Sequence, residues 1–386
     1  MITLESWIGL NKKNEANRLF MQKHLILNLL CVLWLSNSSA QESETYVWHD
    51  PLEILNKIDG QGWSNMSYNR FPDTAENQVR KPVWGLSRHA AGLSIRFISD
   101  ADNIQIKYEV NGNIAMNHMP ATGVSGVDLY GKSAKGKWLW YKGLQTFGDT
   151  ITSKYKTQNN QKTNREYQLY LPLYNNCKKL KVGIPKESRI TFLPQREEKP
   201  IVVYGTSIAQ GACASRPGMA WTNILGRTLD YPIVNLGFSG NGRLEPEVLA
   251  LVTDVAADIY VLDCLPNLSP NKTNTETEIK KRLRNSIQYI RKKRPEAKIL
   301  LTQHAGYGDG EVDTVRKSVY ETLNRWTTEV FEEQQRNSHR NLYMLTKEEI
   351  NLSNDAFVDG THPTDLGMEH YAKAYEKTIL PLLAKE

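Results

Sequence analysis

Downstream of Pro200 the sequence alternates between short apolar runs of β-prone residues and longer amphipathic segments. The expected strands cover residues 201–205, 233–236, 258–263, 298–302 and 341–345. The expected helices lie between and after them, near residues 220–229, 245–253, 276–294, 312–330 and 364–383. Strands that alternate with helices predict a parallel sheet covered by helices on both of its faces.

The helical expectations rest on the spacing of apolar residues. In the segment 276–294, Ile279, Leu283, Ile287 and Ile290 recur at helical spacing, and Pro295 follows the expected end. For residues 312–330 the expected buried stripe consists of Val312, Val315, Val319, Leu323, Trp326 and Val330.

Residues 46–195 show a period of two instead. Leu93, Ile95 and Phe97 alternate with polar residues, and the segments 104–110, 167–173 and 180–184 continue this pattern between turns rich in Gly, Asn and Pro. Short strands with this alternation predict an antiparallel, jelly-roll-like β-sandwich, and no segment in this part has a convincing helical period. A polar stretch bracketed by Pro194 and Pro200 marks the boundary. We therefore expect one domain at 41–195 and another at 196–386.

The first 40 residues resemble a targeting segment. A basic start at 21–24 precedes an eleven-residue apolar run at 25–35, and small residues end at Ala40. This pattern predicts a cleavable secretory signal that is cut after Ala40, so that the protein is exported and not stably inserted in a membrane. Met1 and Met21 are alternative starts.

Composition limits the remaining classes of function. The formal charge is +6 over 386 residues, without the concentrated basic field of a nucleic-acid-binding protein. Beyond the signal segment only Cys177, Cys213 and Cys264 remain. We expect buried free thiols, with a Cys213–Cys264 bridge as the alternative. No spacing of His and Cys indicates a metal site.

Four loops that follow expected strands carry residues suited to catalysis. The first is Gly205-Thr206-Ser207, which offers a candidate nucleophile at the carboxyl end of a strand. The second, at 235–242, is rich in glycine, and a glycine N–H in it is a candidate oxyanion donor. Taken alone, either loop is better explained as a tight turn.

The other two loops supply the partners that a nucleophilic serine needs. Asn267, which follows Pro266, offers a side-chain amide as a further oxyanion donor, or is simply a turn residue. Asp359 and His362 share one short loop, in which Asp359 can orient the imidazole while His362 takes the proton of Ser207. Alternatively, His362 only precedes a helix.

Taken together, these blocks resemble the SGNH (GDSL-like) hydrolases. Gly205-Thr206-Ser207, Gly237-x-Ser239-Gly240, Pro266-Asn267 and Asp359-x-x-His362 occur in the family's order. Thr206 replaces the usual Asp before the nucleophile, and Leu-Pro-Asn replaces Gly-x-Asn in the third block. The segment Gly126-Val127-Asp128-Leu129-Tyr130 resembles the GxDLY motif of a β-sandwich that precedes the hydrolase domain in one subgroup.

The resemblance implies a three-layer α/β/α, flavodoxin-like hydrolase domain that acts without a cofactor or metal. It implies a triad of Ser207, His362 and Asp359, and an oxyanion hole formed by Ser207, Gly240 and Asn267. The expected substrate is an O-acyl, above all O-acetyl, ester of a carbohydrate; the alternatives are a lipid or thioester hydrolase and an inactive glycan-binding protein. Arg216, Trp221 and Tyr307 flank the site loops and are predicted to bind substrate. The oligomeric state and the sugar are not predicted.

Overall fold

The computed structural model describes residues 45–55, 58–64, 67–158, 163–337 and 340–384. The predicted signal sequence and its cleavage site after Ala40 lie outside these residues. Within the described part of the chain, no helix has the length and apolar character needed to cross a bilayer.

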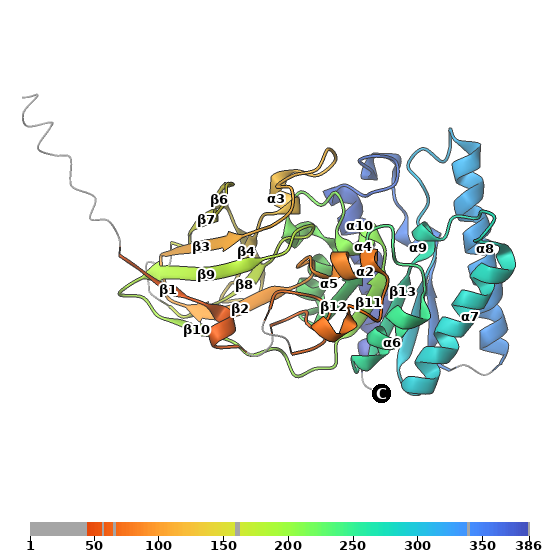
Figure 1. Ribbon diagram of the computed structural model, residues 1–386, viewed down its shortest axis with the longest axis horizontal. Helices are drawn as coiled ribbons and strands as arrows, with labels where there is room; N and C mark the ends of the chain where they lie inside the picture. The colour runs from red at the N-terminus through yellow and green to blue at the C-terminus, as the bar shows by residue number, and fades with distance from the viewer. Residues whose placement is uncertain (1–44, 56–57, 65–66, 159–162, 338–339, 385–386) are drawn as a thin grey trace, which may run out of the picture. The chain divides into compact units, whose positions relative to one another are not determined.

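The amino-terminal half of the described chain contains two antiparallel five-stranded sheets (Figure 1). One has the strand order β1-β9-β3-β7-β6 and the other β10-β2-β8-β4-β5. The strands are β1 (Tyr46–His49), β2 (Ser94–Ser99), β3 (Asn103–Glu109), β4 (Asp128–Lys132), β5 (Trp138–Tyr141), β6 (Gly143–Thr146), β7 (Ile151–Lys156), β8 (Arg165–Tyr170), β9 (Lys178–Pro185) and β10 (Ile190–Phe192).

Apolar and polar residues alternate along these strands because each sheet buries one of its two faces. Ile104 and Ile106 of β3 are fully buried, as are Ile95 and Phe97 of β2 and Leu169 of β8. All five belong to one hydrophobic core that draws on both sheets. The predicted antiparallel β-sandwich is therefore confirmed.

This half also contains short helices, contrary to the expectation of an all-β segment. They are α2 (Lys81–Ser87), α3 (Ala121–Val124), and the 3-10 turns η1 (Pro51–Glu53) and η2 (Asp73–Ala75). In α2 only Val83 and Ser87 are buried, so two turns of helix leave no recognisable apolar stripe in the sequence. Val83 packs with Phe71 and Val79 in the core that lies over the parallel sheet.

The carboxy-terminal half has the predicted parallel sheet, in the order β12-β11-β13-β14-β15. Its strands are β11 (Ile201–Gly205), β12 (Ile233–Gly237), β13 (Ile259–Asp263), β14 (Lys298–Thr302) and β15 (Leu342–Leu345). In order of appearance this is 2-1-3-4-5, the order of flavodoxin-like folds, in which ligands bind where the winding reverses, outside the ends of the first and third strands. Ser207 follows β11, the strand next to this reversal.

Helices cover both faces of the sheet, which confirms the predicted α/β/α layers (Figure 1). They are α4 (Ser207–Gln210), α5 (Trp221–Leu229), α6 (Pro246–Asp254), α7 (Glu276–Lys293), α8 (Thr314–Arg336), α9 (Lys347–Ile350) and α10 (Asp365–Leu383), with 3-10 turns η3 (Pro217–Met219), η4 (Leu265–Asn267) and η5 (Asn354–Ala356).

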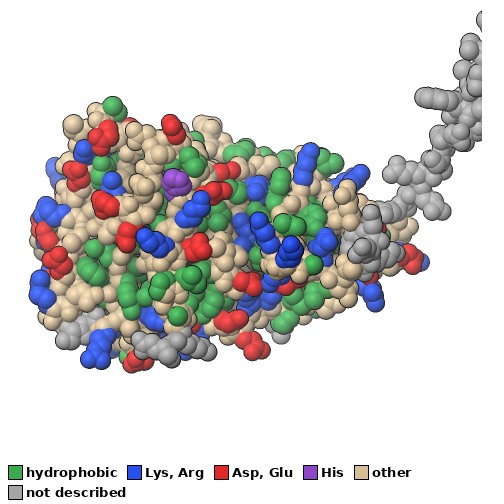
Figure 2. Space-filling view, turned by 180° about the vertical axis from the view of Figure 1, so that it is seen from behind, with side chains coloured by type: hydrophobic (Ala, Val, Ile, Leu, Met, Phe, Trp, Pro, Cys, Tyr) green, Lys and Arg blue, Asp and Glu red, His purple; other side chains and the backbone are tan. Residues whose placement is uncertain are grey.

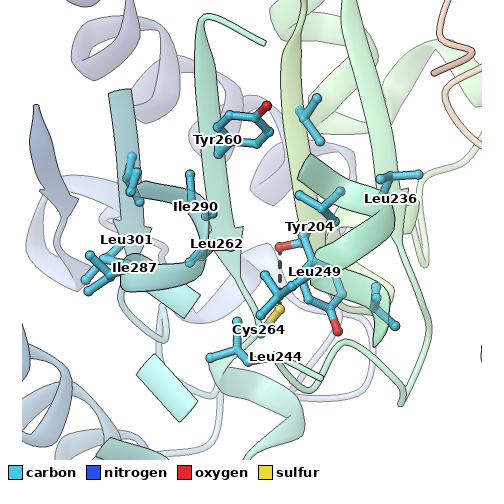
Figure 3. Close-up of a cluster of buried hydrophobic side chains, with 14 of the residues drawn as sticks. Tyr204, Leu236, Leu244, Leu249, Tyr260, Leu262, Cys264, Ile287, Ile290 and Leu301 are labelled. Carbon is cyan, nitrogen blue, oxygen red and sulfur yellow. Dashed lines mark hydrogen bonds between the residues drawn. The ribbon is translucent and has the colours of Figure 1, made fainter. Parts of the chain in front are cut away.

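Each strand contributes side chains to both faces. Val202 and Tyr204 of β11 belong to the core under α6, α7 and α8, and Ile201 and Val203 belong to the core under α5 and α10. Figure 3 shows the first of these cores, where Leu262 of β13 lies among the side chains of α6 and α7. Because both faces of the strands are buried, their sequences are nearly continuous apolar runs.

The predicted stripe of the long helix is wrong at its start. Val312 precedes α8 and is 84% exposed, and Val315 in its first turn is 73% exposed. Asp313 caps the helix by accepting hydrogen bonds from the N–H groups of Val315 and Arg316. The apolar contacts of the core begin one turn later, with Val319 and Leu323.

The three described cysteines are buried and unpaired, as expected. Cys264 lies in the core under α6 and α7, where its thiol donates a hydrogen bond to the carbonyl oxygen of Tyr204 at 3.5 Å (Figure 3). Cys213 lies in the core on the other face of the sheet. The alternative of a Cys213–Cys264 bridge is therefore wrong.

Candidate active site

Ser207 is the first residue of α4, directly after β11. Thr206 is the N-cap, and its side chain accepts a hydrogen bond from the N–H of Ile208. Because the first N–H groups of a helix have no partner within the helix, that of Ser207 is oriented out of the end of α4. The serine is 6% exposed, so its hydroxyl lies in a protected position at the end of the sheet.

Asp359 and His362 lie on the predicted shared loop, and the structure brings this loop to Ser207. The Oγ atom of Ser207 is 2.8 Å from Nε2 of His362, and Nδ1 of His362 is 2.7 Å from Oδ2 of Asp359. Protonation of the ring on Nδ1 satisfies both contacts, since the serine hydroxyl then donates to Nε2. This is the geometry that a serine nucleophile needs with its base and the group that orients the base.

The carboxylate of Asp359 is held in its charged form. Burial acts to raise its pKa, but hydrogen bonds from the ring and the backbone N–H of His362 and from the N–H of Thr361 lower the pKa to about 2. The loop itself is fixed by Arg316, which donates to the carbonyl of Gly360 and to the hydroxyl of Thr361. A charged, fixed Asp359 stabilises a protonated His362, as proton transfer from Ser207 requires.

The glycine-rich loop after β12 packs directly on the serine turn. A Cβ atom on Gly242 would lie 2.1 Å from the carbonyl oxygen of Gly205, so only glycine fits there. Gly240 has φ +68°, and a Cβ atom added there would meet no other group within 4 Å, so no side chain covers its backbone on that side. The N–H of Gly242 donates to Oδ1 of Asn267 at 3.1 Å. This contact fixes the amide of Asn267 and leaves its NH2 group available as a donor.

Sequence reasoning missed Arg70, which holds the end of β12, where this loop begins. It is 1% exposed and donates to four backbone carbonyls, including those of Asn235 and Gly237. Burial lowers its pKa to about 9, although the guanidinium still has carbonyl partners. A single arginine between two strands forms no pattern, so no signal in the sequence identifies this role.

The three predicted substrate-binding residues have different positions. The prediction that Trp221 binds substrate is wrong, because this side chain is fully buried and stacks on Tyr375 with ring centroids 4.1 Å apart. Arg216 binds the carboxylate of Asp128 and the hydroxyl of Tyr130, two residues of the GxDLY segment, and so joins the sandwich to the loop after α4. Tyr307 is half-buried and lies under the guanidinium of Arg316, which holds the loop of His362.

His118 is a second residue that sequence reasoning did not identify. It comes from the sandwich half, is exposed, and has its ring centroid 5.7 Å from that of His362. Donor atoms of His118, Cys213, Asp359 and His362 all lie within 4.8 Å of one another. These donor types suit Zn²⁺. A metal bound there would compete with the hydrogen bonds of His362 described above.

Two family models together cover nearly all of the described chain. Residues 198–380 match the GDSL-like Lipase/Acylhydrolase family, and residues 46–190 match GxDLY, the N-terminus of Esterase_SGNH_hydro-type. The chain is also 32% identical to a protein of Bacteroides ovatus ATCC 8483 whose structure is described as that of a GDSL-like lipase, with 88% of this chain and 98% of that chain covered and a TM-score of 0.79. The chain belongs to the GDSL-like (SGNH) lipase/acylhydrolase family. It is an ester hydrolase, as the resemblance in its sequence predicted.

More distant structures share the fold of this GDSL-like esterase. The salicylyl-acyltransferase SsfX3 from a tetracycline biosynthetic pathway is 18% identical, covers 89% of this chain and 96% of its own, and has a TM-score of 0.65. A family two carbohydrate esterase from Clostridium thermocellum, in complex with cellohexaose, is 12% identical and has a TM-score of 0.50. The match covers 76% of this chain and 94% of that esterase. The comparison with curated proteins finds no match.

Proposed function

We propose that this GDSL-like esterase hydrolyses O-acyl esters of carbohydrates, with acetyl as the preferred acyl group, through Ser207, His362 and Asp359. The observation that carries the proposal is the continuous chain of hydrogen bonds from Oγ of Ser207 through both ring nitrogens of His362 to Asp359, with contacts of 2.8 and 2.7 Å. It lies at the reversal point of the sheet, where flavodoxin-like folds place their sites.

In the proposed reaction, Ser207 attacks the ester carbonyl carbon while His362 takes the hydroxyl proton. The negative charge on the carbonyl oxygen is stabilised by the N–H groups of Ser207 and Gly240 and by the side-chain amide of Asn267. The ester bond then breaks, and His362 returns the proton to the leaving alcohol. Water, deprotonated by His362, attacks the acyl-serine, and the collapse of that intermediate releases the carboxylic acid and restores Ser207.

A carbohydrate substrate is favoured by the surroundings of these donors. Gly240 and Asn267 line a groove of about 980 Å³ whose other side chains are mostly amides, hydroxyls and charged groups. Amides and hydroxyls form hydrogen bonds with sugar hydroxyls, whereas a long acyl chain needs apolar walls. This argument rests on the groove, because the fold alone does not indicate the substrate.

Export is part of the proposal and rests on the sequence of residues 21–40. If the signal is cut as expected, the mature protein isolated from the periplasm or the medium begins at Gln41. A protein that stays in the cytoplasm with Met1 or Met21 at its N-terminus would contradict export.

The substrate class is tested by the rates on chromogenic esters of increasing acyl length, with Ser207→Ala as the matched inactive control. We expect the highest kcat/KM on the acetyl ester, and release of acetate from an acetylated polysaccharide. A maximum on long chains would favour the lipid hydrolase. If wild type and Ser207→Ala are equally inert on every ester, the inactive glycan-binding alternative gains support.

A further inference from the structure

The groove beside the oxyanion donors extends far beyond the reacting ester. It begins at Gly240 and Asn267, passes the start of α6, and continues along α7. Figure 1 shows α6 and α7 next to each other on the same face of the parallel sheet. A groove of about 980 Å³ is at the upper end of the usual range for ligand sites, and a single acetyl group would fill little of it.

The charge of this groove is unbalanced. Its lining contains five basic side chains, Arg80, Arg243, Lys281, Arg282 and Lys292, and two acidic ones, Glu245 and Glu278. Both acidic residues are already paired, Glu245 with Arg80 and Glu278 with Arg282. Arg243, Lys281 and Lys292 are exposed and have no carboxylate partner among the described residues. By contrast, Figure 2 shows basic and acidic side chains interspersed on the face seen from behind.

Two of these cations belong to a polar stripe on α7. Lys281, Asn285, Gln288 and Lys292 are all exposed, line the groove, and recur at helical spacing. The buried stripe of the same helix, at 279, 283, 287 and 290, packs on the sheet. Eleven residues separate the two lysines, which corresponds to about 16 Å along the helix axis. An extended chain of several sugar units can therefore contact both lysines and the amides between them.

Among the unpaired cations of the groove, Arg243 is the one that contacts the glycine-rich loop. Its Nε atom donates to the carbonyl oxygen of Gly240 at 3.0 Å, which fixes the guanidinium at the edge of the glycine-rich loop. The terminal nitrogens form no ion pair with a described residue, so they are available to a ligand. A fixed guanidinium binds a carboxylate through two parallel hydrogen bonds, and its planar shape distinguishes carboxylate from hydroxyl.

Building on the proposed function, we propose that this groove binds an acidic glycan, whose sugar units carry carboxylates, and presents its acyl esters to Ser207. Nucleic acid fits the groove less well, because Tyr289 is the only aromatic residue among the described lining residues, and single strands are bound by stacking on several aromatic rings. Arg243 contacts the carboxylate next to the acylated sugar, and Lys281 and Lys292 contact carboxylates further along the chain.

Binding without turnover tests this proposal separately from the reaction. The Ser207→Ala protein is titrated with polygalacturonate, which carries carboxylates but no ester, and with neutral xylan, at low salt. We expect at least tenfold tighter binding of polygalacturonate and a loss of affinity as salt increases. If the wild-type enzyme fails to hydrolyse any ester, the proposed function fails, but this binding result still decides the role of the groove.

Charge variants show whether the groove is the binding site. The variant Arg243→Gln/Lys281→Gln/Lys292→Gln, in the Ser207→Ala background, should lose about tenfold in affinity for polygalacturonate. The matched control Lys135→Gln/Lys137→Gln/Lys154→Gln removes three exposed lysines of the sandwich that form no ion pair with a described residue, and its affinity should stay within about twofold. If the triple variant does not fold, the double variant Lys281→Gln/Lys292→Gln replaces it in the same measurement. Equal affinity for both glycans, an equal loss in the control, or tighter binding of single-stranded DNA than of polygalacturonate would overturn the proposal.

Discussion

The imidazole of His118 lies beside that of His362, with ring centroids 5.7 Å apart, although the two residues belong to different halves of the chain. Cys213 and Asp359 lie beside them, and one donor atom from each of the four residues lies within 4.8 Å of the others. The base of the proposed triad therefore has candidate metal ligands as neighbours, His118 from the sandwich and Cys213 from the loop after α4.

We expect Zn²⁺ to inhibit the enzyme and EDTA to leave its activity unchanged. A zinc ion bound by this group occupies a ring nitrogen of His362 and so displaces Ser207 or Asp359 from it. The measurement is the initial rate on an acetyl ester in micromolar Zn²⁺ and after chelation. His118→Asn should reduce the sensitivity to Zn²⁺ by about tenfold, because it removes one ligand. A loss of activity in EDTA that Zn²⁺ restores would contradict the metal-free mechanism.

Replacing Asp359 by Asn should lower kcat by about 10³- to 10⁴-fold while the protein stays folded. The amide cannot stabilise a protonated His362, and it favours the wrong ring tautomer. Because the pKa of Asp359 is lowered to about 2, the carboxylate stays charged throughout the range of a practical pH–rate profile. The stability that Asp359 contributes is present above about pH 4 and is lost as the pH falls towards 2. A variant with a near wild-type rate would remove Asp359 from the triad.

Asp263, at the end of β13, should make the protein less stable as the pH rises. It is fully enclosed, accepts a hydrogen bond from Tyr375 at 3.1 Å, and burial raises its pKa to about 7. Between pH 4 and 7 the unfolded chain ionises this carboxyl more readily than the folded one, so the free energy of unfolding falls. Asp263→Asn should therefore gain about 3 kcal/mol relative to wild type between pH 5 and pH 8. The free energies of unfolding are measured by denaturant titration. The same difference between Asp263→Asn and wild type at pH 5 and at pH 8 would contradict this prediction.

Asp128 of the GxDLY segment should be important for stability. Its buried carboxylate accepts hydrogen bonds from Arg216, from the indole N–H of Trp140 at 2.6 Å and from the N–H of Gly218 at 3.0 Å. Burial raises its pKa, and these donors partly offset that effect. Asp128→Ala leaves the guanidinium of Arg216 without its carboxylate, and should lower the free energy of unfolding by about 3–5 kcal/mol.

The double variant Asp128→Ala/Arg216→Met is the control for this pair. It removes both charges, so part of the stability lost in Asp128→Ala should return. If Asp128→Ala unfolds at the same denaturant concentration as wild type, the contact between the sandwich and the loop after α4 is not important for stability.

Periodicity predicted most of the fold because most elements bury a regular pattern. The inner apolar stripe of α7 predicts a helix, and the apolar runs of β11 and β13 predict buried strands. The four site loops could then be located because each comes after a strand of the parallel sheet. Short helices escaped prediction for the opposite reason. With only Val83 and Ser87 buried, α2 is defined by its tertiary contacts and not by a local pattern.

The part of the site that was not predicted depends on contacts distant in sequence. Arg70 reaches the carbonyl of Gly237 across 167 residues, and His118 meets His362 from the other half of the chain. The position of Trp221 beside a site loop predicts a contact with substrate, but successive residues of an α-helix project about 100° apart, and the ring of Trp221 stacks on Tyr375 in the core. Proximity in sequence to a site loop does not determine which way a side chain points.

The role of Ser207 is tested most directly by its covalent chemistry. Wild type and the variants Ser207→Ala and His362→Ala are incubated with a fluorophosphonate, which reacts with activated serines, and the adduct is located by peptide mass spectrometry. We predict one adduct on Ser207 in wild type, none in Ser207→Ala, and a reaction slowed by at least about 10³-fold in His362→Ala, since the base is missing. An adduct on a different serine, or the same rate without His362, would contradict the proposed mechanism.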